Sequence, residues 1–158
     1  MREIKFRAKP NKAYFFASEN VPTTDGFVFG TPDTRMLNVP GADIWRKNME
    51  GFFDEPSIVA MTSDGCPRSV VVIEDTICEF SGLQDKKGHD IYEGDIVKWD
   101  KDKKLYVVVF RNGMFYASVE ECNHKIYGGF PLWCLCEEEQ HCVVVGNRYD
   151  NADLLIVK

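Results

Sequence analysis

The sequence predicts a mainly β protein with minor helical content. Aromatic residues make up 13% of the chain, short runs rich in β-branched residues recur along it, and turn-forming dipeptides separate those runs. An apolar fraction of 44% in 158 residues suffices to bury a core without disulfides or a metal. We expect a β-rich N-terminal part with an irregular middle, residues 1–78, and a small-barrel part, residues 79–158, together in one compact unit.

Short strands separated by helix and strand breakers are expected in the first part. Residues 2–8 alternate polar and apolar side chains, which predicts a half-buried strand with Ile4, Phe6 and Ala8 inward. Arg7 then lies on the polar face. Asp64 and Gly65 favour a tight hairpin, while residues 31–56 leave room for at most a short helix around 42–49. Further strands are expected at residues 13–17, 26–30, 57–62 and 69–73.

The second part has clearer strand signals. Asn112 and Gly113 favour positive φ angles and therefore a tight hairpin. A loose segment is expected around Gly128, Gly129 and Pro131, and residues 147–155 suggest a turn followed by one helical turn. Short strands joined by hairpins are typical of a small closed barrel. The expected strands are residues 96–99, 105–110, 114–119 and 142–145.

The charge argues against a protein that holds nucleic acid mainly through phosphate contacts. The formal net charge is −6, with nine basic against eleven acidic residues in 1–78 and ten against fourteen in 79–158. Phosphate binding needs a basic face. Only the first twelve residues are predominantly basic, so nucleic-acid binding through the barrel and this N-terminal arm is an alternative rather than the leading hypothesis.

The N-terminus has basic residues but no apolar run of the kind found in secretory signals. No apolar stretch is long enough to span a bilayer. We therefore expect a cytoplasmic protein without membrane association, whose six cysteines are reduced thiols.

The stretch GHDIYEGDIVKW, residues 88–99, places acids among residues typical of a buried strand. Glu93 and Asp95 would share one face of a strand, where two carboxylates can act as an acid/base pair. Gly94 between them favours a turn instead, in which Asp95 accepts hydrogen bonds from backbone N–H groups. We expect turn chemistry rather than catalysis. If a functional surface includes this stretch, the candidate interaction residues are Asp85, Tyr92 and Glu93.

Cysteine and histidine side chains, which are zinc ligands, gather in two short clusters. The spacing does not match zinc knuckles or ribbons, which favour about two to four residues between cysteines. A C-x-C pair on a strand points both thiols along one face. Packing of the cysteines in the core is therefore preferred, no cofactor is expected, and a zinc-stabilised module is an alternative. The candidate ligands are Cys122, His124, Cys134, Cys136, His141 and Cys142.

No catalytic residue is predicted. His141 and Cys142 are adjacent, and adjacent residues on a strand face opposite ways, so they cannot share a proton directly. The sequence contains no nucleophile elbow, phosphate-cradling glycine loop or dinucleotide fingerprint.

Aromatic residues in the second part exceed what a small barrel needs in its interior. Some of them could therefore form a binding face, and together with edge strands they favour self-association. For any single residue, packing in the core is the preferred interpretation. These residues are Tyr92, Trp99, Tyr106, Phe115, Tyr116, Tyr127, Phe130 and Trp133.

Three stretches carry a family resemblance: MREIKFRA at residues 1–8, FSGLQDKKGHDIYEGDIVKW at 80–99 and VVGNRYDNADLL at 144–155. In this order they resemble the YopX family of phage and prophage proteins. The chain departs from the family pattern at Lys9, where the pattern has Trp, and at Ala152, where it has Pro. No cysteine or histidine falls on the pattern. The matching residues are Gly82, Leu83, Asp85, Gly88, Ile91, Tyr92, Glu93, Gly94, Asp95, Ile96, Val97, Gly146, Asn147, Tyr149, Asn151, Leu154 and Leu155.

The resemblance implies a β-rich fold with an SH3-like barrel in the C-terminal half. It also implies a home in a bacteriophage, prophage or other mobile element, and it brings no activity with it. Together with the residue patterns, it leads us to expect a non-enzymatic accessory protein that acts through contacts with an unidentified protein partner or with copies of itself.

Overall fold

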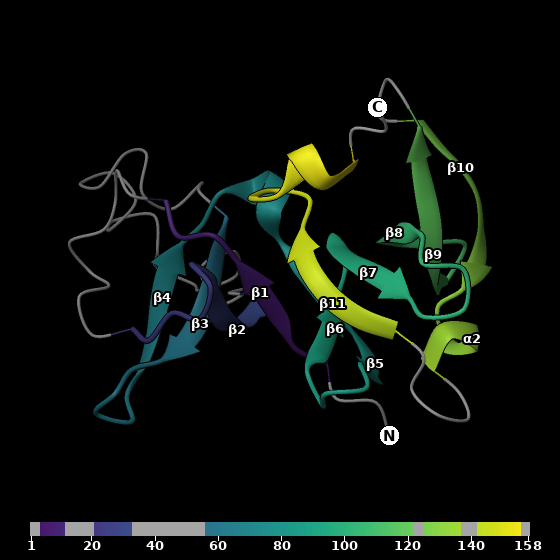
Figure 1. Cartoon of the computed structure of the whole chain (residues 1–158). Coiled ribbons are helices and arrows are strands. Elements are labelled where there is room, and N and C mark those ends of the chain that lie inside the picture. Colours follow the sequence, from purple (N-terminus) through teal and green to yellow (C-terminus); the bar gives the residue numbers. More distant parts are fainter. Residues whose placement is uncertain (1–3, 12–20, 33–55, 122–124, 137–141, 156–158) are drawn as a thin grey trace. The chain divides into compact units, whose positions relative to one another are not determined.

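Short antiparallel strands make up most of the described chain, which confirms the predicted mainly β class. The computed structural model describes residues 4–11, 21–32, 56–121, 125–136 and 142–155 (Figure 1). The chain divides into two compact units, one formed by Ile4–Ile77 and the other containing Cys78–Lys158. We call them the N-terminal unit and the barrel unit. No helix within the described ranges is long and apolar enough to cross a membrane.

The N-terminal unit is built on an antiparallel sheet in which β1 pairs with β2, β2 with β3 and β3 with β4. Its core contains Val28, Ile58 and Val70, contributed by three of these strands. A 3₁₀ helix, η3 (Glu74–Thr76), follows the sheet. The strand predicted at 13–17 and the helix predicted around 42–49 lie outside the described residues. The strands are β1 (Phe6–Ala8), β2 (Val28–Pro32), β3 (Ser57–Met61) and β4 (Pro67–Val71).

Strand β1 departs from the alternation that the sequence predicts. Arg7, expected on the polar face, is only 9% exposed, and Ile4, expected inward, is exposed. The strand begins at Phe6, so the alternation does not extend to Ile4. The Arg7 guanidinium carbon lies 4.4 Å from the centre of the Phe27 ring, which compensates for burying the charge through a cation–π contact.

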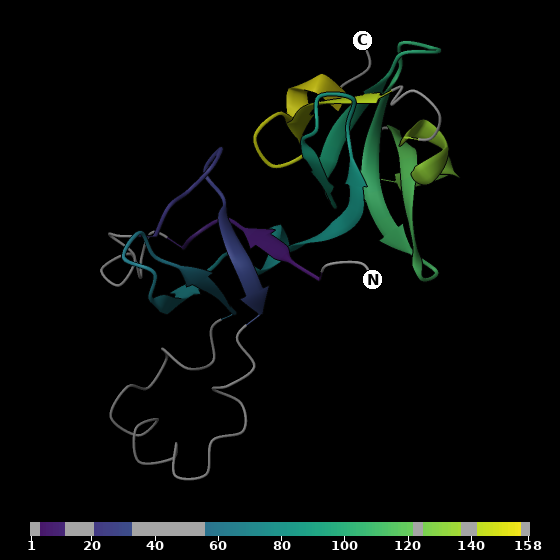
Figure 2. The ribbon, with the colours of Figure 1, turned by 90° about the horizontal axis from the view of Figure 1, so that it is seen from below.

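The barrel unit contains a hairpin and a five-stranded antiparallel sheet in the order β10-β9-β8-β7-β11. The sheet curls (Figures 1 and 2), which fits the predicted small barrel. The last strand, β11, pairs with the first strand of this sheet, β7. The hairpin consists of β5 (Cys78–Gln84) and β6 (Asp90–Tyr92). The sheet consists of β7 (Asp95–Trp99), β8 (Leu105–Arg111), β9 (Met114–Glu121), β10 (Lys125–Pro131) and β11 (Cys142–Asn147).

Local turn signals in this unit are largely confirmed. Asn112 and Gly113 have φ angles of 51° and 78°, as the tight hairpin between β8 and β9 requires. The segment expected to be loose is instead strand β10, with a register shift between Tyr127 and Phe130. A short helix, α2 (Trp133–Cys136), follows it, and a 3₁₀ helix, η4 (Ala152–Leu155), supplies the helical turn predicted near the C-terminus.

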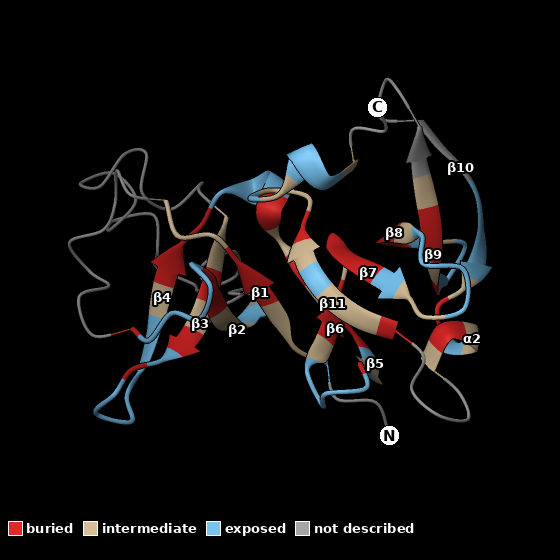
Figure 3. Ribbon diagram, viewed as in Figure 1, coloured by how far each residue is buried: buried red, intermediate tan, exposed pale blue. Residues whose placement is uncertain are grey.

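The core of the barrel unit lies inside the curled sheet. Val97 from β7, Val108 from β8 and Ala117 from β9 are completely buried, and Leu132 and Leu135 reach the same cluster from the end of β10 and from α2. Figure 3 shows most of β7 buried and part of β10 exposed, and residues 128–130 are the exposed ones there. The same core includes Cys142, where β11 begins.

Candidate functional site

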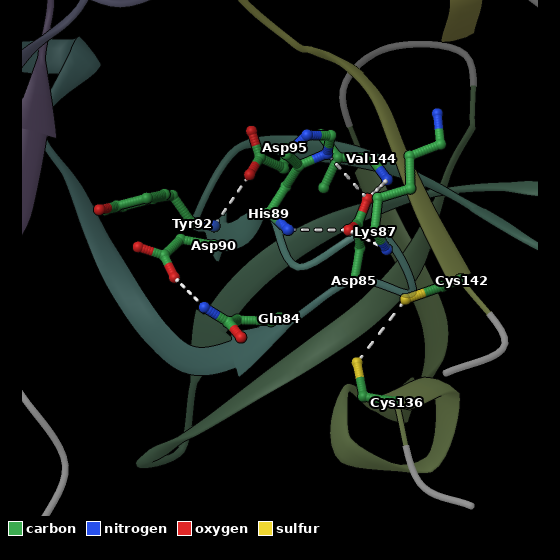
Figure 4. A network of polar contacts seen from close by, with 10 residues as sticks. All are labelled: Gln84, Asp85, Lys87, His89, Asp90, Tyr92, Asp95, Cys136, Cys142 and Val144. Atoms are coloured by element: carbon green, nitrogen blue, oxygen red, sulfur yellow. Dashed lines mark hydrogen bonds and ion pairs between the residues drawn. The ribbon is translucent and has the colours of Figure 1, made fainter. Parts of the chain in front are cut away.

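Asp85 lies at the centre of the turn that opens the central motif (Figure 4). Its carboxylate Oδ1 accepts hydrogen bonds from the backbone N–H groups of Lys87 at 2.8 Å and His89 at 2.9 Å. Its Oδ2 accepts one from the N–H of Val144, in β11, at 3.0 Å. One side chain therefore stabilises a local turn and connects it to the last strand of the sheet.

The electrostatics of Asp85 follow from these contacts. Burial would raise the pKa of Asp85, but the N–H groups of His89, Val144 and Lys87 outweigh it and hold this pKa below its ordinary value. His89 Nδ1 lies 3.3 Å from Oδ2, so a protonated imidazole would stabilise the carboxylate further. Asp85 is therefore held as a carboxylate that accepts hydrogen bonds.

The candidate interaction residues Asp85, Tyr92 and Glu93 do not form an exposed patch. Asp85 is 0% exposed and Tyr92 is 3% exposed. Glu93 is half-buried, and its Oε1 accepts a hydrogen bond from the N–H of Phe110 at 3.1 Å. Asp85 and Tyr92 are thus structural in this unit rather than available to a partner, because the turn that they build folds them inward.

Gly94 and Asp95 form the bend that the turn interpretation predicts. Gly94 has a φ of 78°, and a Cβ at this position would lie 2.9 Å from the ring of Tyr149. Asp95 is buried, and its Oδ2 accepts a hydrogen bond from the N–H of Tyr92 at 2.8 Å. The carboxylate of Asp95 therefore stabilises the turn between β6 and β7.

The closing motif is held by a second polar network. Asn147 Oδ1 accepts hydrogen bonds from the N–H groups of Tyr149 and Asp150, both at 3.0 Å. Asn151 Oδ1 accepts one from the N–H of Asn147 at 3.1 Å. The Cys78 thiol donates to the Tyr149 hydroxyl at 3.5 Å, so this turn also contacts the start of β5.

Two of the predicted metal ligands meet in the structure. Cys136, at the end of α2, and Cys142, at the start of β11, have their sulfur atoms 3.6 Å apart (Figure 4). Cys134 is half-buried on α2. Cys122, His124 and His141 lie outside the described residues. Within the described ranges, no group of three or more His, Cys, Asp or Glu residues is arranged to hold a metal ion.

The C-x-C pair is helical, not extended as the sequence interpretation assumed. Cys134 and Cys136 both belong to α2, where residues two apart point in different directions. Cys136 is therefore directed to Cys142 without Cys134 sharing its face. The contact between the two sulfur atoms raises the pKa of Cys136 and lowers the pKa of Cys142.

Aromatic side chains from β7, β8 and β10 meet in one cluster. The ring centres of Trp99 and Phe130 are 5.7 Å apart, and Tyr106 lies 6.3 Å from each of them. We call these three residues the aromatic cluster. Phe130 is 47% exposed. The hydroxyl of Tyr106 donates to the carboxylate of Asp102, and burial together with this bond raises the pKa of Tyr106 to about 12.

Other aromatic residues from the predicted set are divided between core and surface. Phe115, like Tyr92, is buried, and Tyr116 is half-buried with the Arg111 guanidinium carbon 4.6 Å from its ring centre. Trp133, on α2, is 46% exposed. The side chain of Tyr127 lies outside the described part. Phe110 is also exposed, although its β-branched strand gave no sign of this in the sequence.

The comparison with protein families bears on the motif residues just described. A family model described as YopX protein matches residues 34–156, which is most of the chain. The chain belongs to the YopX family. No curated protein matches it. Among solved structures, the crystal structure of protein EF1440 from Enterococcus faecalis is similar, at 18% sequence identity and a TM-score of 0.46, over 98% of this chain and 99% of that one.

Structural roles account for the polar residues that this YopX chain shares with the family pattern. Asp85, Asp95 and Asn147 each accept backbone hydrogen bonds within the barrel unit. Gly94 has no room for a Cβ beside Tyr149. The exposed part of the aromatic cluster, Phe130, is not among the residues that carry the family resemblance.

Proposed function

We propose that this YopX protein is a non-enzymatic accessory protein of a phage, prophage or other mobile element, and that it works through protein contacts. Family membership supports the assignment to a mobile element. The observation that carries the proposed mode of action is the aromatic cluster of the barrel unit, in which the exposed Phe130 ring rests on Trp99 and Tyr106.

An exposed ring that packs against two other rings suits a binding site. Its position is largely fixed before binding, so little side-chain entropy is lost when a partner covers it. Aromatic residues with such support dominate the binding energy of many protein interfaces. Lys101 adds a positive charge here, because its Nζ lies 5.5 Å from the centre of the Trp99 ring. The carboxylate of Asp102, on the Tyr106 hydroxyl, offsets this charge, so the cluster is suited to bury an apolar side chain of a partner.

Nucleic-acid binding through the basic N-terminal arm is the alternative function, and the contacts of that arm weigh against it. Arg7 and Lys9 are both directed at the ring of Phe27, at 4.4 and 5.0 Å. Titration of the full chain with single- and double-stranded oligonucleotides at low salt separates the two functions. Binding that weakens steeply with added salt would favour the alternative.

The proposed function predicts that Phe130→Ser weakens capture of a protein partner. The bait is tagged full-length protein in lysate of the bacterial host, with captured proteins quantified by mass spectrometry and self-association measured by light scattering. Truncation of an aromatic side chain that packs against its neighbours at an interface typically lowers the binding free energy by about 2 kcal/mol, which is roughly thirtyfold in affinity.

Phe110→Ser is the matched control. Phe110 is an exposed phenylalanine of the same unit. Its ring centre lies 4.9 Å from that of Phe115, and it does not belong to the aromatic cluster. Both variants are first checked for wild-type thermal melting. A strictly monomeric protein that captures nothing, or equal loss of capture in both variants, would contradict the proposal.

A further inference from the structure

Cys136 and Cys142 form a thiol pair whose arrangement goes beyond core packing. The two sulfur atoms point toward one another across 3.6 Å (Figure 4). Cys136 is half-buried, whereas Cys142 is completely buried behind it. A partly exposed cysteine thus has its sulfur in direct contact with the sulfur of a completely buried one.

The backbone around the pair holds one sulfur firmly and the other less so. Cys142 begins β11 opposite Trp99, and its carbonyl accepts a hydrogen bond from the N–H of Lys86 at 3.1 Å. Cys136 is the last residue of a four-residue helix. A disulfide has an S–S length of about 2.05 Å, so the sulfurs must approach by roughly 1.5 Å. Rotation of the Cys136 side chain with a small shift of α2 can supply this movement.

We propose that Cys136 and Cys142 are a site of reversible oxidation, at which a peroxide converts the two thiols into an intramolecular disulfide. This inference is independent of the proposed protein-binding function. The bond would link the end of α2 to the start of β11, two residues before Val144, whose N–H binds the carboxylate of Asp85.

The chemistry balances with hydrogen peroxide as the oxidant. The thiolate of Cys136 attacks one peroxide oxygen, the O–O bond breaks, hydroxide leaves, and the sulfur becomes a sulfenic acid. The thiolate of Cys142 then attacks that sulfur, and a second hydroxide leaves as the S–S bond forms. The two thiol protons convert both hydroxides to water. Two electrons pass from the thiols to the peroxide.

Nearby charges affect the rate of the first step. The carboxylates of Asp85 and Asp100 face the pair and disfavour a thiolate, while Lys86 forms an ion pair with Asp100. Only the thiolate attacks peroxide, so these two carboxylates slow the first step.

The test uses full-length protein treated with hydrogen peroxide and then with an alkylating reagent. Residues 137–139 are all glutamate, so a glutamate-specific protease separates the two cysteines into peptides that only a disulfide holds together. We expect the Cys136–Cys142 linkage to account for most of the thiols lost, with the intact mass falling by two hydrogens. Added dithiothreitol should restore both thiols.

Variants provide the control. Cys66→Ser removes an exposed cysteine of the N-terminal unit and should leave the linkage intact, whereas Cys136→Ser should abolish it. The peptide map of the wild-type protein remains decisive even if Cys136→Ser fails to fold. Linkages spread over other cysteines would overturn the proposal. A second outcome would also overturn it. If the thiols of the untreated protein react with the alkylating reagent only after a chelator has been added, they are bound to a metal.

Discussion

A turn built around Asp64 in the N-terminal unit and a turn built around Asp85 in the barrel unit share the same local chemistry. In the N-terminal unit, Asp64 accepts a hydrogen bond from the hydroxyl of Thr62 and a longer one from the N–H of Cys66 at 3.4 Å. In the barrel unit, Asp85 accepts its local hydrogen bonds from Lys87 and His89. Both carboxylates have a pKa below the ordinary value for aspartate.

What separates the two turns is a contact that neither local sequence reveals. Asp64 is exposed and binds only its neighbours, whereas Asp85 is buried and also accepts a hydrogen bond from Val144, 59 residues further along the chain. The local turn signal predicts the shape of both turns. The distant partner decides which aspartate supports the fold, and only Asp85 belongs to the pattern that resembles the YopX family.

The largest predicted effect is the loss of the Asp85 carboxylate. Asp85→Ala removes a buried carboxylate that accepts three backbone hydrogen bonds, from Lys87, His89 and Val144, and we expect the free energy of unfolding to fall by about 3 kcal/mol. Asp64→Ala removes exposed hydrogen bonds and should cost less than about 1 kcal/mol. Urea denaturation of both variants, followed by circular dichroism, measures the difference. Equal losses would remove the distinction between the turns.

A smaller effect is expected at Gly88 and Gly94, two glycines of the central motif with positive φ angles. Gly94→Ala places a methyl group 2.9 Å from the Tyr149 ring at a φ of 78°, so both strain and a clash apply. We expect a loss of about 2–3 kcal/mol in the free energy of unfolding. Gly88→Ala has a φ of 81° but open space around the added carbon, and should cost about 1–2 kcal/mol. Thermal melts of the two variants rank them, and the reverse order would show that the contact with Tyr149 is not tight.

The smallest effect concerns acid stability. The pKa of Asp85 is lower in the folded protein than its ordinary value of 3.8, so the unfolded chain binds the proton more readily. The carboxylate therefore contributes stability above this value, and the contribution is lost as the pH falls through the folded-state pKa. Urea midpoints from about pH 6 down to about pH 3 should fall less steeply for Asp85→Asn than for wild type. Parallel curves for the two proteins would contradict this assignment.

Features that depend on neighbouring residues could be predicted from the sequence. The hairpins at Asp64-Gly65 and Asn112-Gly113 and the bend at Gly94-Asp95 follow from backbone preferences within a few residues, and the structure has them. The mainly β class follows from the density of such turns between β-branched runs.

Features that depend on distant partners could not be predicted in this way. Arg7 is buried because Phe27 lies beside it, and Asp85 is buried because β11 returns to the same place. Strand β10 forms despite Gly128 and Gly129 because β9 offers it a hydrogen-bonding edge and the register shift absorbs the two glycines. The Cys136–Cys142 contact needed both the helical turn of α2 and the position of β11.

The pairing of β11 with β7 also has a consequence for the order in which the protein is made. The ribosome synthesises the Asp85 turn and the first four strands of the five-stranded sheet before it adds Val144. Until then the carboxylate of Asp85 has only its local donors, and the edge of β7 that β11 will cover remains open. The barrel unit therefore completes its fold only after β11 has been made, and until then an unpaired strand edge is exposed to other newly made chains. A chain truncated before Val144 would contain the Asp85 turn but could not complete the fold of the barrel unit.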